Sequence, residues 1–432
     1  MPASYEKHRA PASAGGHGSG LGYAFAVLLF VIGSDLYVVA PLLSGIQKTM
    51  HCTVSQAGLL VTAFTAGYML ASPLIGGLTD RLGRLVVLYV GISLFIFFEA
   101  ISAWAPSYPI LIVARAMSGI AAAAITPTAY TIIGDTVAYS ERSHVMAIAS
   151  AGFSVSTIAG VPLGLWLSNF WSWRGVLWVL TAATAAAAVA LPVSLKSRNL
   201  LVRSPGTGSA GGTEEAWNSP GPPVVSSVQG MRKLIATWPV LVVSFLAFAV
   251  VGLVYTYLVV DLGDRFGWSK NGLIGVLFLY GLANVAGNLA LGHFGDRSGK
   301  RCAVRLGQMV ELAGLVAMAV MLWNPEQSVL VAALCVFAFG QAYIPNLKAL
   351  ASAVDPEIRG RSQAWNNAAM YGGMMLGSWG ASSGYEWLGL RGLVLAAIVV
   401  LGLAWIAAAA ILESDAAEAW AKPRNDGPLV ES

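Results

Sequence analysis

The chain has 432 residues, of which 56% are hydrophobic and 11% are charged, whereas an ordinary soluble domain has about 25% charged residues. So few charged residues cannot cover a water-soluble globule, which excludes a soluble globular protein. The formal net charge of +4 does not point to a nucleic-acid partner, because the basic residues are scattered between apolar stretches. We expect none.

Twelve apolar stretches are long enough, or nearly so, to cross the hydrocarbon core, which takes about 20 residues as a helix. They lie at roughly 21–45, 55–79, 85–104, 108–131, 144–168, 173–194, 236–260, 271–293, 302–323, 327–348, 362–385 and 390–412. Polar tails flank them at 1–20 and 413–432, and the Gly-, Ser- and Pro-rich stretch 196–235 predicts a flexible linker. The sequence therefore predicts an all-α membrane protein with six-helix bundles at 21–195 and 236–412.

The distribution of basic residues predicts the orientation, because loops rich in Lys and Arg stay in the cytoplasm. With the N-terminus inside, the linker, both tails and most basic loops are cytoplasmic. The opposite face keeps only Lys48, Arg174, Arg265, Lys270 and Arg391. We therefore expect both termini in the cytoplasm and a multi-pass protein of the cell membrane, most simply a bacterial inner membrane.

An internal repeat relates the two halves. "GGLTDRLGR" at Gly76–Arg84 reappears as "GHFGDRSGK" at Gly292–Lys300, and Asp296 follows Asp80 by 216 residues, half of the 432-residue chain. Each copy follows the second helix of its half. Glycines let helix ends approach closely, and the Asp can cap the next helix while it pairs with neighbouring basic residues.

These two loops resemble the signature loop of the major facilitator superfamily and its weaker repeat. The matching residues are Gly76, Leu78, Asp80, Arg81, Gly83 and Arg84 in the first loop, and Gly292, Asp296, Arg297, Gly299 and Lys300 in the second. The first copy departs from the pattern at Leu85, where the family often has another base. The resemblance implies the major facilitator fold, in which these loops form a conformational latch and do not bind substrate. The alternative is a merely basic loop on the inner face.

Two ionisable residues lie inside predicted spans. Arg115, four residues before Gly119 in "LIVARAMSGIAAA", resembles the Arg of the family's fourth helix. An Arg inside a span costs about 2.5–3.5 kcal/mol on insertion scales, so it faces a cavity or a carboxylate unless it snorkels to the helix end. Asp35 in "FVIGSDLYVVAPLL" is the candidate partner, and bonding to Ser34 or to a backbone carbonyl is the alternative for it.

An Asp–Arg couple in a membrane can gain and lose a proton, because desolvation favours the neutral carboxyl and the guanidinium favours the charged one. Related efflux transporters carry an acidic residue on the first helix in this context. We therefore expect Asp35 and Arg115 to act in proton coupling.

The fifth predicted helix contains "GFSVSTIAGVPLG", which resembles a segment of the antiporter branches of the superfamily. The matching positions are Gly152, Ser156, Gly160, Pro162 and Gly164, although a Val precedes the Pro and Leu165 replaces a final Gly. Small residues permit close packing and a Pro bends a helix, so the segment can seal one end of a cavity. Generic small-residue packing is the alternative.

Other polar residues in the spans are candidates for the wall of a substrate cavity, and hydrogen bonding between helices explains each of them equally well. These candidates are Tyr255, Tyr257, Asn284, Asn288, Gln341, Asn346, Asn367 and Tyr371. We expect Glu99 and Glu311 to lie near span ends, where a carboxylate reaches water.

The resemblance implies a transporter of the twelve-helix drug:proton antiporter branch, which includes exporters of sugars and metabolites. We expect proton-driven efflux of a small organic molecule by a monomer. The alternatives are a proton symporter or facilitator that imports a solute, and a membrane receptor or scaffold that does not transport. No nucleotide-binding or zinc-protease motif occurs. We therefore expect no enzymatic activity, no metal and no cofactor, the proton gradient being the energy source.

Overall fold

The computed structural model describes residues 17–137, 139–196, 237–323, 326–352 and 359–412. The N-terminal half contains α1 (His17–Met50), α2 (Val54–Leu82), α3 (Arg84–Trp104), α4 (Tyr108–Thr136), α5 (Tyr139–Val155), the π-helix η1 (Ser156–Gly160), α6 (Val161–Leu167) and α7 (Trp173–Lys196). The C-terminal half contains α9 (Trp238–Phe266), α10 (Lys270–Ser298), α11 (Lys300–Met321), α12 (Gln327–Gly340), the 3₁₀-helix η3 (Gln341–Tyr343), α13 (Ile344–Ser352) and α14 (Arg359–Leu412). The predicted linker beyond Lys196, the C-terminal tail and most of the N-terminal tail lie outside the described residues.

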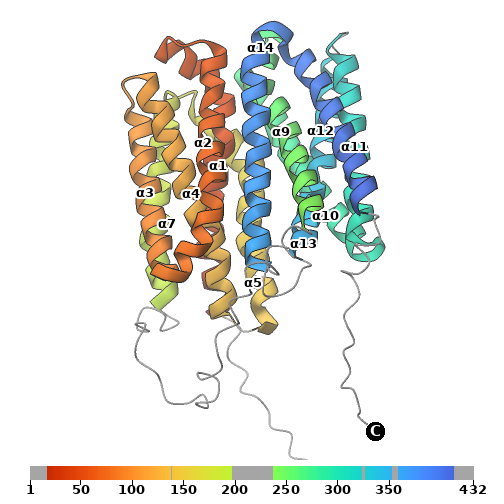
Figure 1. Cartoon of the computed structure of the whole chain (residues 1–432). Coiled ribbons are helices and arrows are strands. Elements are labelled where there is room, and N and C mark those ends of the chain that lie inside the picture. The colour runs from red at the N-terminus through yellow and green to blue at the C-terminus, as the bar shows by residue number, and fades with distance from the viewer. Residues whose placement is uncertain (1–16, 138, 197–236, 324–325, 353–358, 413–432) are drawn as a thin grey trace, which may run out of the picture.

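Eleven helices in this part of the chain are long and apolar enough to cross a membrane. The last of them, Ser362–Ala409, is 48 residues long and contains both of the last two predicted stretches. Its backbone leaves helical geometry at Gly389, where φ is 59° and ψ is −174°, and Figure 1 shows α14 turning back on itself there. Because each arm is about 20 residues or longer, α14 supplies two spans, and the predicted number of twelve is reached.

Local sequence explains where the helices begin and end. At the start of α2, Gln56 N donates to Thr53 Oγ1 at 3.1 Å while Thr53 N donates to Gln56 Oε1 at 2.9 Å, a reciprocal capping box. Gly83 and Gly299 occupy equivalent positions in the two repeated loops, with φ of 86° and 95°. Only glycine adopts such angles without strain. The repeated glycines therefore produce the same sharp turn between two helices in each half.

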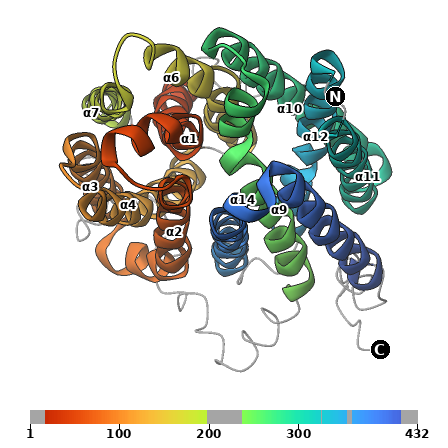
Figure 2. The same cartoon turned by 90° about the horizontal axis from the view of Figure 1, so that it is seen from above.

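The two halves stand side by side (Figures 1 and 2). We call the end of the bundles where α7 ends and α9 begins the linker end, and the end where α1 meets α2 the far end. Figure 2 shows α2 next to the first arm of α14, and α6 next to α10, so both junctions join an N-terminal helix to a C-terminal helix.

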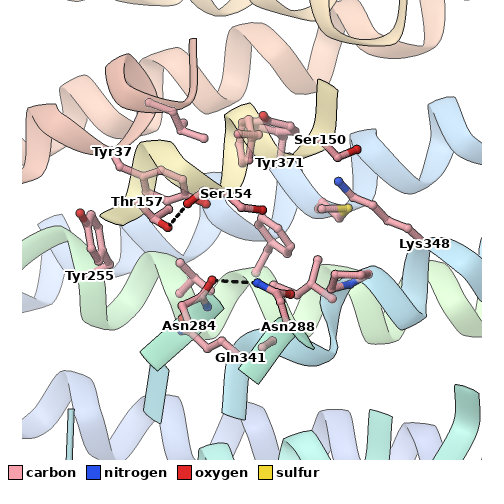
Figure 3. Close-up of a pocket in the computed structure, with 18 of the residues that line it drawn as sticks. Tyr37, Ser150, Ser154, Thr157, Tyr255, Asn284, Asn288, Gln341, Lys348 and Tyr371 are labelled. Carbon is pink, nitrogen blue, oxygen red and sulfur yellow. Dashed lines mark hydrogen bonds between the residues drawn. The ribbon is translucent and has the colours of Figure 1, made fainter. Parts of the chain in front are cut away.

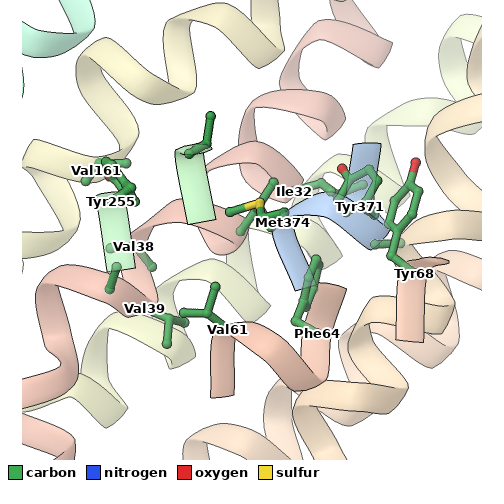
Figure 4. Close-up of a cluster of buried hydrophobic side chains, with 14 of the residues drawn as sticks. Ile32, Val38, Val39, Val61, Phe64, Tyr68, Val161, Tyr255, Tyr371 and Met374 are labelled. Carbon is green, nitrogen blue, oxygen red and sulfur yellow. The ribbon is translucent and has the colours of Figure 1, made fainter. Parts of the chain in front are cut away.

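Contacts between the halves are both polar and apolar. Thr62 Oγ1 on α2 lies 2.8 Å from Ser378 Oγ on α14. Tyr68 stacks on Tyr371 with ring centroids 3.5 Å apart, and Met374 of α14 belongs to the same buried cluster as residues of α1 and α2 (Figure 4). Along α2, the contact with α14 is therefore as close as a helix–helix contact within one bundle.

Small residues let α2 and α4 approach at backbone distance. A Cβ added at Gly119 would lie 2.0 Å from the Phe64 carbonyl oxygen, and one added at Gly67 would lie 2.1 Å from the Ala116 carbonyl oxygen. This approach places the Arg115 guanidinium 4.7 Å from the centre of the Phe64 ring. The glycine that follows Arg115 by four residues therefore holds the arginine against α2.

We predict that Gly119→Ala destabilises the protein, because its methyl group would have to displace the backbone of α2, at a cost of about 1–3 kcal/mol. The matched control is Gly275→Ala on α10, where an added Cβ meets nothing within 4 Å. Thermal unfolding of the purified proteins in detergent measures both. Equal melting temperatures for the two variants would contradict the close packing of α2 on α4.

Candidate functional site

Arg115 lies at the centre of a buried cluster with two carboxylates. Its Nη1 donates to Asp35 Oδ1 at 2.8 Å, to Asp35 Oδ2 at 3.0 Å and to Glu99 Oε1 at 2.8 Å. The three residues come from α4, α1 and α3, and their exposed fractions are 1%, 0% and 0%. The structure thus brings together the predicted pair Asp35–Arg115 and adds a third member.

The burial of this cluster corrects one prediction and decides between two alternatives. Glu99 does not reach water as expected, because it faces α4 and not the end of α3. Arg115 does not snorkel. Ser34 Oγ donates to the Phe30 carbonyl at 2.7 Å, and the carboxylate of Asp35 faces Arg115.

The charges within the cluster do not balance when all three groups are ionised. One guanidinium then faces two carboxylates, which gives a formal charge of −1 in a site without exposed atoms. A proton on either carboxylate makes the cluster neutral. Arg115 Nε and Glu99 Oε2 have no hydrogen-bond partner within the described residues. The arrangement is therefore chemically able to hold one proton.

A cavity of about 250 Å³ lies between the two halves. Six of the eight predicted cavity residues line it: Tyr255, Asn284, Asn288, Gln341, Asn367 and Tyr371. Figure 3 shows Asn284 and Asn288 joined by a hydrogen bond of 3.1 Å on one side and Tyr371 on another. Leu36 and Tyr37, which follow Asp35 directly, also line the cavity.

The other two predicted cavity residues do not line it. The Tyr257 hydroxyl lies 3.2 Å from the Val54 carbonyl and 3.0 Å from Ser382 Oγ, where it joins the halves near the far end. Asn346 Nδ2 donates to the Leu291 carbonyl at 3.2 Å and joins α13 to α10. Sequence position placed both residues in spans but did not give the face of the helix on which they lie.

Most of the aromatic wall escaped sequence reasoning. Tyr37, Tyr68, Tyr130 and Tyr280 line the cavity, as do Phe153 and Phe248. Edge-to-face contact joins Tyr37 to Tyr255 across the halves, with ring centroids 5.4 Å apart. The sequence did contain one indication of this wall, because most of the spans that form it carry a tyrosine with a polar hydroxyl group.

The segment from Gly152 to Gly164, which we call the antiporter-like segment, packs tightly on α1. Added Cβ atoms at Gly152, Gly160 and Gly164 would lie 2.0 Å from the Ala26 carbonyl oxygen, 1.9 Å from Ser34 Oγ and 2.2 Å from Val38 Cγ2. Between these positions the helix widens into the π-turn η1, just before Pro162. On its other side η1 meets α10, where a Cβ at Gly281 would lie 2.5 Å from the Ile158 Cα. The segment therefore connects the helix that carries Asp35 to the C-terminal half.

The two repeated loops lie at the linker end. Arg84 forms an ion pair with Asp135 at the end of α4, and Lys300 Nζ lies 2.5 Å from Asp296 Oδ1. Arg81 and Arg297 are exposed. The side chain of Asp80 lies outside the described part of the structure. Among the described loop residues, the ion pairs stay within one half.

Glu311 is also buried and not near water as expected. It lies in the middle of α11 with 1% of its surface exposed, and a Cβ at Gly340 would lie 2.2 Å from its backbone nitrogen. Close packing of α11 on α12 thus covers the side chain. Its neighbour Gln341 accepts a hydrogen bond of 2.6 Å from Tyr280, which lines the cavity.

Two helical bundles around a central cavity define a membrane-embedded transporter. The family model of the Major Facilitator Superfamily matches residues 25–347 and, in a second match, residues 240–431. The chain belongs to this superfamily.

Relatives and solved structures agree with this family. The chain is 28% identical over 270 residues to the Bacillus subtilis protein called uncharacterized MFS-type transporter YfhI, which covers 62% of this chain and 63% of that relative. It is 23% identical over 390 residues to YbcL of the same organism, and this match covers 90% of this chain and 92% of that relative. It is 26% identical over 306 residues to the chloramphenicol resistance protein of Streptomyces lividans, covering 70% and 73%. The chain thus spans less than two thirds of YfhI but most of the other two.

Solved structures show the same fold. The human organic anion transporter MFSD10 (TETRAN) superposes with a TM-score of 0.67 at 18% identity, covering 91% of this chain and 99% of that one. A peptide transporter POT superposes with a TM-score of 0.70 at 13% identity, covering 91% and 94%. At these identities the likeness concerns the fold alone.

We predict that Arg115→Ala strongly destabilises the protein at neutral pH, by about 3–5 kcal/mol, because two buried carboxylates lose their counter-charge. Arg115→Lys should destabilise the protein less than Arg115→Ala does. It should still be less stable than the wild type, since an ammonium cannot reproduce the forked hydrogen bonding of a guanidinium. Protonation removes the need for a counter-charge, so the loss in Arg115→Ala should shrink as the pH falls. Melting curves at several pH values measure this. A loss independent of pH would contradict the charge argument.

Proposed function

We propose that the protein is a proton-coupled exporter of a small organic molecule, which works by alternating access. The observation that supports this most directly is the buried cluster of Arg115 with Asp35 and Glu99. A cluster that is neutral only with one proton on a carboxylate is the minimum equipment for exchanging protons across a membrane. No cofactor is required, because the proton gradient supplies the energy.

The proton site and the cavity are connected through α1. Asp35 belongs to the cluster, and the next two residues, Leu36 and Tyr37, line the cavity. A change of protonation alters the attraction between Asp35 and Arg115, and thereby the position of α1 against α4. Because Tyr37 touches Tyr255 of the other half, such a movement reaches the interface between the halves. Proton and solute are thus coupled through the shape of the cavity wall.

We assign the direction of transport as outward. The Asp–Arg couple serves an importer equally well, and the likeness to the chloramphenicol resistance protein of Streptomyces lividans favours export. In this proposal the linker end faces the cytoplasm of a bacterial cell, both termini are cytoplasmic and the protein works as a monomer. The loops around Asp80 and Asp296 then act as latches on the cytoplasmic side.

We predict that Asp35→Asn abolishes uphill transport and leaves exchange of solute down its own gradient. The amide has nearly the volume of the carboxyl group but does not titrate at physiological pH. Proteoliposomes with a pH gradient measure the first activity, and solute counterflow at equal pH on both sides measures the second. The matched control is Glu326→Gln, which removes an exposed carboxylate at the start of α12 and should leave both activities unchanged.

Two outcomes would contradict the proposal. Normal proton-driven transport by Asp35→Asn would remove Asp35 from proton coupling. Binding of a solute by the wild type without any flux would identify a receptor and not a transporter.

We predict that a disulfide between Thr62→Cys and Ser378→Cys stops transport and that a reductant restores it. The two hydroxyl oxygens lie 2.8 Å apart across the halves, so the sulfur atoms should be within bonding reach after small adjustments. The bond would hold α2 against α14 and prevent rocking between the two states. The background should lack the free thiols of Cys52, Cys302 and Cys335.

Each single cysteine variant serves as the control and should transport normally with or without oxidant. Unchanged transport by a fully cross-linked double variant would show that α2 and α14 do not separate during the cycle, which would contradict alternating access at this junction.

A further inference from the structure

The wall of the cavity is aromatic on both sides. Six tyrosines and two phenylalanines line it. The rings of Tyr37, Tyr255 and Tyr280 follow one another, with centroid distances of 5.4 and 5.8 Å. Aromatic side chains bind planar solutes by offset stacking and edge contacts, and they contribute a large apolar area. The cavity therefore suits a solute with an aromatic ring.

The cavity wall carries one kind of charge. Among the described residues that line the cavity, Lys348 is the only charged one, and none is a carboxylate. The nearby acids Asp35 and Glu99 are already engaged by Arg115 and have no exposed surface. A cationic solute would thus find no counter-charge on this wall, whereas an anion would find an ammonium group.

The position of Lys348 on α13 directs its amine into the cavity. Side chains on a helix tilt toward its N-terminus, and α13 begins in the interior at Ile344 and ends at the linker end at Ser352. Figure 3 shows the amine pointing back toward Ser150 and Tyr371. A lysine that merely snorkels would extend the other way, toward water at the linker end.

The amine is also available to a ligand. Lys348 is exposed, it lines the cavity, and no ion pair with a described carboxylate involves it. An ammonium in such a site gains a strong charge-assisted hydrogen bond when an anion arrives.

We infer that the solute is an aromatic organic anion, whose ring lies among the tyrosines and whose acidic group is bound by Lys348. This inference concerns the substrate class and rests on the proposed transport function for its physiological meaning. Aromatic cations should be poor ligands, because they would be placed beside an uncompensated ammonium.

Three probes with the same ring system test the inference: naphthoate, naphthamide and naphthylmethylammonium, which carry a negative charge, no charge and a positive charge. Their affinities for the full-length protein in detergent are measured by isothermal titration calorimetry. We expect naphthoate to bind about tenfold more tightly than naphthamide, as a charged hydrogen bond requires, and the ammonium probe to bind most weakly.

Substitutions assign the difference to one side chain. Lys348→Gln should weaken naphthoate about tenfold and leave naphthamide unchanged, while Lys348→Arg should retain the preference for the anion. Lys270→Gln, which removes an exposed lysine at the far end, should change neither. Naphthoate that does not bind, binds no better than naphthamide, or binds Lys348→Gln as it binds the wild type would overturn the inference.

Transport is measured separately, so that the two proposals can fail independently. Anion binding without proton movement in proteoliposomes would contradict the exporter and leave the substrate class standing. Proton-coupled movement of the ammonium probe, with no binding of naphthoate, would leave the exporter standing and contradict the substrate class.

Discussion

A guanidinium shared by two carboxylates in the interior of a membrane protein is the constraint on which the N-terminal half depends. An isolated charge at this depth is costly, so Arg115 requires Asp35 and Glu99, and each of them requires Arg115. The three residues come from α1, α3 and α4. The cluster therefore fixes how these helices face one another, and glycines such as Gly119 make the required approach possible.

The same half combines tight packing with an irregular helical turn at η1. The antiporter-like segment packs by glycines against α1 over its whole length, yet its hydrogen bonding changes to a π-turn at η1. Such turns weaken the regular ladder of a helix and are often found at functional positions. Because η1 also meets α10 at Gly281, it is one of the contacts through which a shift of α1 would reach the second half.

Sequence reasoning predicted which residues lie in the spans but not which face of a helix each of them occupies. Hydrophobic runs and the repeat of Asp80 at Asp296 predicted the spans and the two halves, because span length and repetition are properties of the chain itself. Which side of a helix faces a cavity depends on the neighbouring helices. For that reason Glu99 was expected near water, Tyr257 was expected at the cavity, and Lys348 was not among the candidate cavity residues. Asp35 and Arg115 were predictable since each is costly without the other.

The placement of charge suggests why a transporter of this kind needs two halves. In our proposals the proton is held in the N-terminal half by the Arg115 cluster, and the solute is held by Lys348 of the C-terminal half. Neither group lies in the other's site, so proton and solute do not compete for the same atoms. They compete instead for the same arrangement of the halves, since both act on the interface where Tyr37 meets Tyr255. Coupling of this kind requires only that each ligand prefers one arrangement of the two bundles.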